Sequence, residues 1–140
     1  MRVLCVARHQ ILSEHLCRVF ERFDVAAAGV VGMRQARTSI ATHDPDVALC
    51  DYDLLTPTQL ELWRADPASG GVPIVAVSMT KRPHEVTATE ERGVVAFIYL
   101  PKLEPETARA LFTALRRRRD GVASPNLLSW PGTTPVVRQR

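Results

Sequence analysis

Carboxylate, hydroxyl and ammonium side chains follow three short apolar runs of this sequence, close to the point where each run ends. The first run is followed by Asp51 and Asp53, the second by Ser78, and the third by Lys102. A carboxylate can accept a phosphoryl group as a nucleophile, and a hydroxyl and an ammonium can hold the oxygens of that group. The residues alone leave two interpretations open: an acidic nucleophile or anion site, or a simple ion pair between Asp51 and Lys102.

Lys102 stands out because the chain strongly favours arginine as its basic residue. Only Lys81 and Lys102 are lysines among the 18 basic residues. A lysine ammonium is a compact point charge, whereas the arginine guanidinium is a planar fork, so the two are not interchangeable. In a chain so biased towards arginine, a lysine is expected to be kept where its own chemistry is used.

Metal and disulfide chemistry are not indicated by the cysteines and histidines. Cys5, Cys17 and Cys50 are odd in number, widely spaced and without a Cys-x-x-Cys pair. This spacing predicts buried thiols in a reducing compartment and not a disulfide framework or a zinc site. The four histidines likewise show no metal-ligand spacing.

The hydrophobic pattern alternates between strands and helices along the chain. Apolar runs without a helical period predict strands over residues 2–7, 25–31, 47–50, 72–77 and 94–100. Apolar residues at helical spacing, together with capping signals, predict helices over 11–22, before 44, from 56, over 83–92 and over 105–118. Such alternation predicts a parallel sheet with helices on both faces, since each crossover returns the chain to the same sheet. The carboxyl ends of its strands then share one edge, where ligands bind in open parallel sheets.

Length and composition indicate one soluble domain. The chain has 140 residues, of which 46% are hydrophobic and 24% charged. We expect a folded domain over 1–119, a proline-containing C-terminal tail over 120–140, and a cytoplasmic location, since no apolar run approaches the ~20 residues of a membrane helix. The run Arg116–Arg119 is typical of a last helical turn, so nucleic acid is not an expected partner.

Three segments carry a resemblance to a known family. Residues 45–51 (PDVALCD), 73–78 (PIVAVS) and 96–102 (AFIYLPK) resemble the third, fourth and fifth strands of receiver domains from bacterial two-component response regulators, and the likeness extends over 2–118. The resemblance implies a flavodoxin-like (βα)5 fold, in which a doubly wound parallel sheet has five strands in the order 2-1-3-4-5.

The resemblance also implies roles for single residues. Asp51 matches the phosphoacceptor, Ser78 the hydroxyl that meets the phosphoryl group, and Lys102 the lysine that pairs with its oxygens. Tyr99 matches the aromatic switch residue, and Asp53 lies where the family offers a backbone carbonyl to magnesium.

The metal-binding side of this pattern is missing. The family has two acidic residues after the first strand that hold magnesium, and here these positions are Ala7 and Arg8. Asp51 and Asp53 remain as the only weak candidates for metal ligands, so no metal cofactor is expected unless phosphorylation is retained. Arg8 can instead form an ion pair with Asp51, which would compete with the use of Asp51 as a nucleophile. Proline also precedes Lys102 instead of following it, which changes the reach of this lysine.

These features favour a stand-alone atypical receiver (a pseudo-receiver) that acts through protein–protein contact and is not an enzyme, with magnesium-dependent phosphorylation of Asp51 impaired or absent. The alternatives are a working phospho-receiver with a non-standard cation site and, from another class, a flavodoxin-like module that binds a nucleotide or another small molecule. The resemblance implies a histidine kinase or a downstream signalling protein as partner. It also implies a possible homodimer through the helix 83–92, the strand 94–100 and the helix 105–118.

Overall fold

The computed structural model describes residues 1–80, 93–119 and 133–134. Within them, one sheet has the strand order β2-β1-β3-β4-β5-β6, and its first five strands are parallel. The strands are β1 (Arg2–Ala7), β2 (Ala26–Val31), β3 (Val47–Asp51), β4 (Ile74–Ser78), β5 (Val94–Tyr99) and β6 (Thr133–Thr134). The predicted parallel five-stranded sheet and its order 2-1-3-4-5 are therefore confirmed.

Four α-helices and two 3-10 helices connect these strands in the described part of the chain. They are α1 (Gln10–Glu21), α2 (Gly32–His43), η1 (Tyr52–Leu54), α3 (Pro57–Ala65), η4 (Leu100–Lys102) and α4 (Pro105–Arg119). The helix expected over 83–92 lies outside the described residues.

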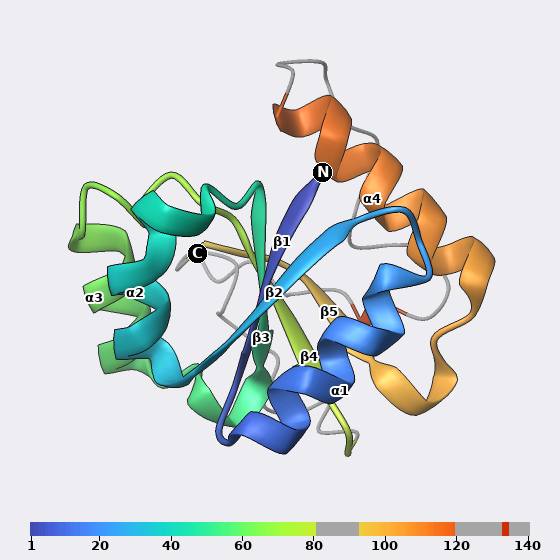
Figure 1. Cartoon of the computed structure of the whole chain (residues 1–140), viewed down its shortest axis with the longest axis horizontal. Coiled ribbons are helices and arrows are strands. Elements are labelled where there is room, and N and C mark those ends of the chain that lie inside the picture. Colours follow the sequence, from blue (N-terminus) through green and yellow to red (C-terminus); the bar gives the residue numbers. More distant parts are fainter. Residues whose placement is uncertain (81–92, 120–132, 135–140) are drawn as a thin grey trace.

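Helices cover both faces of the sheet, which gives two separate hydrophobic clusters (Figure 1). On one face α1 and α4 bury residues such as Phe20 and Phe112 against the sheet, with the two rings edge to face at 5.9 Å. On the other face α2 and α3 bury Ile40 and Trp63. Because side chains alternate along a strand, each central strand supplies both clusters, and its residues are apolar almost throughout.

Local signals explain where the helices begin and end. The Thr56 hydroxyl accepts a hydrogen bond from the Gln59 amide at 3.2 Å, and Pro57 occupies the first turn of α3, as the capping pattern predicts. At the end of α2, Asp44 adopts a left-handed conformation (φ 44°) and Pro45 prevents any continuation.

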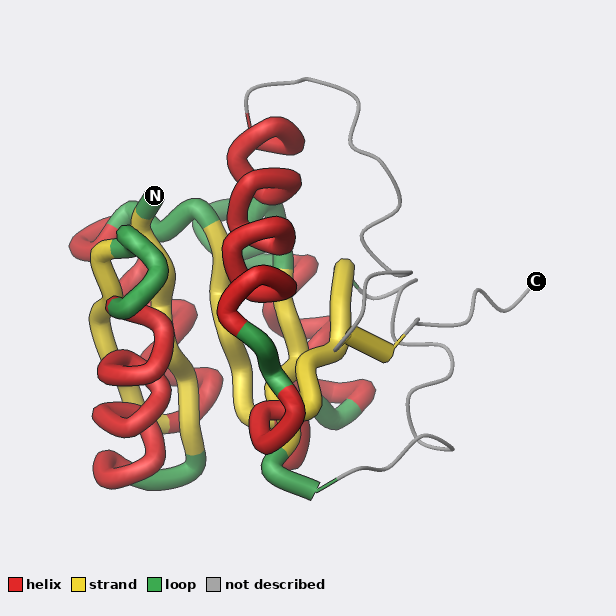
Figure 2. Tube along the Cα trace, turned by 90° about the vertical axis from the view of Figure 1, so that its right-hand side faces the viewer, coloured by secondary structure: helices red, strands yellow, loops and turns green. Residues whose placement is uncertain are grey.

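The sixth strand was not expected from the sequence, which predicted only a tail beyond residue 120. Thr133 and Thr134 pair antiparallel with Ile98 and Phe97 of β5 (Figure 2). Without them the outer edge of β5 would present unpaired backbone groups, which attract a further strand. The tail thus extends the sheet at this position.

Candidate functional site

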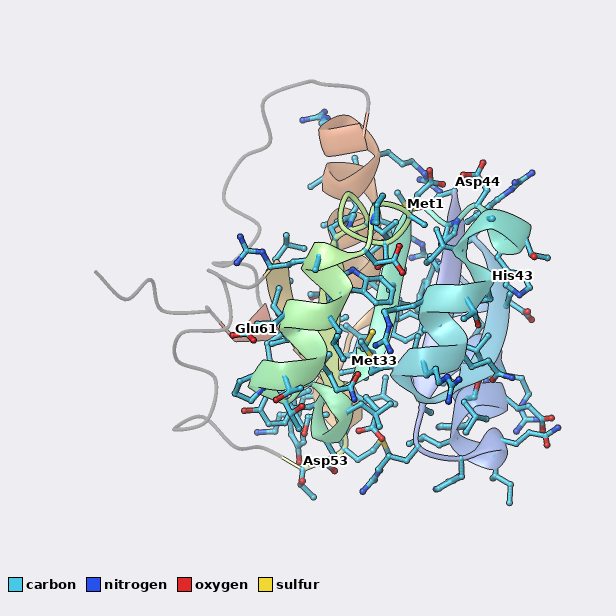
Figure 3. The ribbon with its side chains drawn as sticks, turned by 90° about the vertical axis from the view of Figure 1, so that its left-hand side faces the viewer. Met1, Met33, His43, Asp44, Asp53 and Glu61 are labelled. Carbon is cyan, nitrogen blue, oxygen red and sulfur yellow. The ribbon has the colours of Figure 1, made fainter. Side chains whose placement is uncertain are left out.

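The strand ends place the predicted residues along one edge of the sheet. Asp51 is the last residue of β3, and Ser78 and Tyr99 are the last residues of β4 and β5, paired with each other in the strand register. Arg8 directly follows β1. The strands begin at the end of the molecule where Met1 lies, and Asp53 lies at the opposite end (Figure 3). Asp51, Ser78, Tyr99 and Arg8 therefore all lie at the carboxyl edge of the sheet.

Asp51 is a buried carboxylate whose oxygens both have partners. Its side chain is only 8% exposed, and its Oδ2 accepts a hydrogen bond from Arg8 Nε at 2.7 Å. Its Oδ1 accepts one from the backbone N–H of Asp53 at 3.2 Å, which caps the 3-10 helix η1. These bonds offset the cost of removing the charge from water.

Arg8 bridges two carboxylates with its guanidinium fork. Besides the bond to Asp51, its Nη1 lies 3.0 Å from Oδ2 of Asp53. The geometry suits arginine, because the planar group presents several N–H donors at fixed angles, which a lysine ammonium does not. The Arg8 side chain is half exposed, so solvent reaches one side of this cluster. The pairing of Arg8 with Asp51, inferred from the sequence, is thus present, and Asp53 is a second partner that the sequence did not reveal.

A magnesium ion does not fit this arrangement. Magnesium requires oxygen ligands in octahedral geometry, and Ala7 offers no side-chain oxygen. One oxygen of each remaining carboxylate, Oδ2 of Asp51 and Oδ2 of Asp53, contacts the cationic guanidinium of Arg8. Within residues 1–80, 93–119 and 133–134, no group of three or more His, Cys, Asp or Glu side chains could hold a metal.

In the described part of the chain, Ser78 and Lys102 do not belong to the ion-pair cluster that Arg8 forms with Asp51 and Asp53. The Ser78 hydroxyl donates to the Thr80 carbonyl and accepts a hydrogen bond from the Thr80 amide at 3.1 Å. Lys102 is exposed at the end of η4, a 3-10 helix that contains Pro101. Of the two cations considered for Asp51, Arg8 makes the ion pair; the described residues show none between Asp51 and Lys102.

Tyr99 ends β5 half-buried and lies beside Ser78 in the register of the sheet. An aromatic contact nearby involves other residues: the ring of Tyr52 meets Phe97 edge to face at 5.3 Å. Tyr52 is the first residue of η1, so this contact helps to hold the 3-10 helix that carries Asp53. The sequence offered only the position of Tyr52 next to Asp51 as a signal for this role.

Several solved structures are similar to this chain, and among them are response regulators and isolated receiver domains. The chemotaxis response regulator CheY4 of Vibrio cholerae is 15% identical, with a TM-score of 0.62, and the match covers 81% of this chain and 97% of that one. A sensor protein from Polaromonas sp. JS666 is 19% identical, with a TM-score of 0.65 over 87% and 98% of the two chains. An atypical orphan response regulator, described as having a phosphorylation-independent regulatory mechanism, is 15% identical, with a TM-score of 0.62 over 84% and 96%.

These likenesses establish the receiver fold for this chain. No protein-family model matches the sequence, and no curated protein matches it either. In the described part of the chain, the helices are all too short or too polar to cross a membrane.

Proposed function

We propose that this protein is an atypical receiver module of two-component signalling that acts by protein–protein contact, with magnesium-dependent phosphorylation of Asp51 impaired or absent. The observation that supports this most directly is the guanidinium of Arg8, bound to the carboxylates of both Asp51 and Asp53. The module acts by binding and not as an enzyme. The protein that it binds is a histidine kinase or a downstream signalling protein.

The first reason is the reactivity of the carboxylate. When Oδ2 of Asp51 is the oxygen that attacks a phosphodonor, it gives up its hydrogen bond from Arg8 Nε, and a hydrogen bond to a charged group contributes about 1.5–3 kcal/mol. Since each 1.36 kcal/mol changes a rate tenfold, this loss alone slows attack by roughly 10- to 150-fold.

The second reason is the charge available to stabilise the transferred group. A divalent ion bridges the attacking and transferred oxygens and neutralises the charge that develops there. Arg8 supplies a single positive charge, which the two carboxylates already share. The fold also occurs in the atypical orphan regulator, whose description names a phosphorylation-independent mechanism.

The partner surface that we favour is the side of the molecule formed by β5 and α4. The outer edge of β5 carries β6, so a partner or a second copy that pairs with this edge must displace Thr133 and Thr134. A partner that contacts α4 instead meets a basic end, since this helix finishes in the run Arg116–Arg119. An acidic partner surface complements it.

A working phospho-receiver is the second candidate, and the exposure of Arg8 favours it. Half of the Arg8 side chain faces solvent, which leaves room for the guanidinium to move from Asp51 onto the oxygens of a bound phosphoryl group. In this case Arg8 itself replaces the metal ion.

Phosphorylation of the purified protein by acetyl phosphate, with and without magnesium, tests both candidates. We expect no phosphoprotein in intact-mass spectra of the wild type under either condition, and no magnesium-dependent change in its melting temperature. Arg8→Asp is expected to bind magnesium and to gain phosphate at Asp51. Arg34→Asp, the same charge change at an exposed position of α2, is the matched control and should behave as the wild type.

Stoichiometric phosphate on wild-type Asp51 would refute the leading proposal. If this phosphorylation occurs without magnesium and is lost in Arg8→Ala, the second candidate is correct. Asp51→Asn shows in either case that the modification is on this residue.

A further inference from the structure

Two of the three cysteines face each other across the contact between α1 and β1. Cys5 is fully buried on β1, and Cys17 of α1 packs half-buried against the same hydrophobic cluster. Cys50 is buried in the cluster on the opposite face of the sheet. The sheet therefore separates Cys50 from the other two thiols.

A small-residue contact draws α1 close to the sheet at this point. The Ser13 hydroxyl donates a hydrogen bond to the Cys5 carbonyl at 3.1 Å, and Cys17 lies one helical turn beyond Ser13 on the same face of α1. Gly29 of β2 is the register partner of Cys5. A Cβ added to Gly29 would lie 2.4 Å from Ser13 Oγ and 3.3 Å from Cys17 Sγ. The absence of a side chain at Gly29 thus lets the Cys17 sulfur approach β1 and β2.

The two thiols also interact with each other. A side-chain hydrogen bond with Cys5 lowers the pKa of Cys17, against the opposing effects of burial and of Glu21 and Glu14. The same hydrogen bond raises the pKa of Cys5, and burial adds to this effect. These opposite directions make Cys17 the more acidic thiol of the pair, and the thiolate is the form of cysteine that reacts with oxidants.

Small reagents can reach Cys17 from outside the sheet. A groove of about 510 Å³ lies between α1, the edge strand β2 and the beginning of α2. Cys17 lines it together with Ser13, Gly29, Arg18 and Gln35. The buried partner Cys5 is not among its lining residues, so a reagent in the groove meets Cys17 first.

We propose that Cys17 and Cys5 form a redox-active thiol pair, in which Cys17 reacts with a hydroperoxide and Cys5 then closes a disulfide between α1 and β1. The Cys17 sulfur attacks one peroxide oxygen; an S–O bond forms, the O–O bond breaks, and the second oxygen leaves as water or an alcohol after protonation. Sulfenic acid results at Cys17. The Cys5 sulfur then displaces the hydroxyl group, which leaves as water with the Cys5 proton. Two thiols are oxidised and one peroxide is reduced.

This step is independent of the site at Asp51, so it holds whether or not the protein accepts phosphate. Its consequence is a covalent link between α1 and β1, the strand that leads into Arg8. Residues of α1 would then be unable to separate from β1.

Peroxide treatment of the full-length, reduced protein tests the proposal. Free thiols are blocked after the reaction, and the protein is digested without reduction and mapped by mass spectrometry. We expect a Cys5–Cys17 disulfide within one chain, the loss of two of the three thiols, reduced Cys50 as an internal control, and full reversal by dithiothreitol. Peroxide is used in excess and for a short time, so that the rates at which the three thiols react are compared.

Three variants sharpen the result. Cys50→Ser should lose two thiols, like the wild type, and Cys17→Ser should lose none. Cys5→Ser should stop at sulfenic acid on Cys17, which dimedone traps; if this buried substitution prevents folding, the wild-type map and Cys17→Ser still decide. The proposal is overturned if all three wild-type thiols stay reduced, if the disulfide joins two chains, or if Cys17 oxidises to sulfinic acid while Cys5 stays reduced.

Discussion

Removal of the Arg8 side chain is expected to destabilise the protein, because the buried carboxylate of Asp51 then lacks its cationic partner. In Arg8→Ala, Asp51, whose side chain is 8% exposed in the wild type, loses the 2.7 Å hydrogen bond from Nε and still has Asp53 as an acidic neighbour. Loss of one partner from a fully buried pair costs about 3–5 kcal/mol, whereas an exposed pair contributes about 0–1 kcal/mol. Since Arg8 is half exposed, we expect the free energy of unfolding to fall by about 2 kcal/mol.

The same reasoning predicts that the loss depends on Asp51. Asp51→Asn removes the charge that Arg8 balances, so Arg8→Ala in that background should cost much less. We expect a coupling free energy of about 1–2 kcal/mol from the double-mutant cycle. A coupling free energy of this sign shows that Arg8 stabilises the protein by balancing the buried charge of Asp51. A general effect of shortening the side chain at residue 8 would give no coupling.

Urea titrations at neutral pH, followed by circular dichroism, give the four free energies of this cycle. Melting temperatures should agree, with a decrease of roughly 6–10 °C in Arg8→Ala. Arg34→Ala controls for the loss of an arginine at an exposed position. A coupling free energy inside the additivity error of about 0.3–0.5 kcal/mol would show that the bridge contributes nothing to stability, and the reasoning would be wrong.

Two further stability changes follow from contacts away from this site. Gly29→Ala places a Cβ 2.4 Å from Ser13 Oγ and should lower the free energy of unfolding by about 1–3 kcal/mol, while Gly71→Ala, with open space around it, should change it little; equal urea midpoints for the two variants would contradict this. Thr56→Ala removes the cap that accepts a hydrogen bond from Gln59 and should cost about 1 kcal/mol in the same titration, whereas Thr56→Ser should retain most of it.

The positions of the strands were predictable because their signal is local. Strands buried on both faces are runs of apolar residues, and the acidic pair Asp51 and Asp53 marks the end of one run. The start of β4 differs from the prediction for a local reason as well. Val72 uses its carbonyl to accept a hydrogen bond from Trp63 Nε1 at 3.0 Å, and Pro73 has no N–H, so the strand begins at Ile74.

The site itself was predictable only as a set of residues at one edge. The sequence indicated both Arg8 and Lys102 as candidate partners of Asp51, and the choice between them depends on side-chain reach and on the turn after each strand, which the sequence does not encode. The 3-10 helix containing Pro101 ends at an exposed Lys102, whereas Arg8 lies next to both carboxylates. Likewise, the pairing of Cys5 with Cys17 depends on Gly29, a residue of a third element.

The substitution at position 8 changes more than one interaction at the carboxyl edge. An acidic residue there would add a third negative charge beside Asp51 and Asp53, and a divalent cation would be needed to keep these charges close. Arginine balances the carboxylates without any ion, since its fork contacts both. We propose that the site holds its buried carboxylate without a metal, so that its arrangement is the same with and without magnesium. Such constancy suits the proposed module, whose partner recognises a fixed surface.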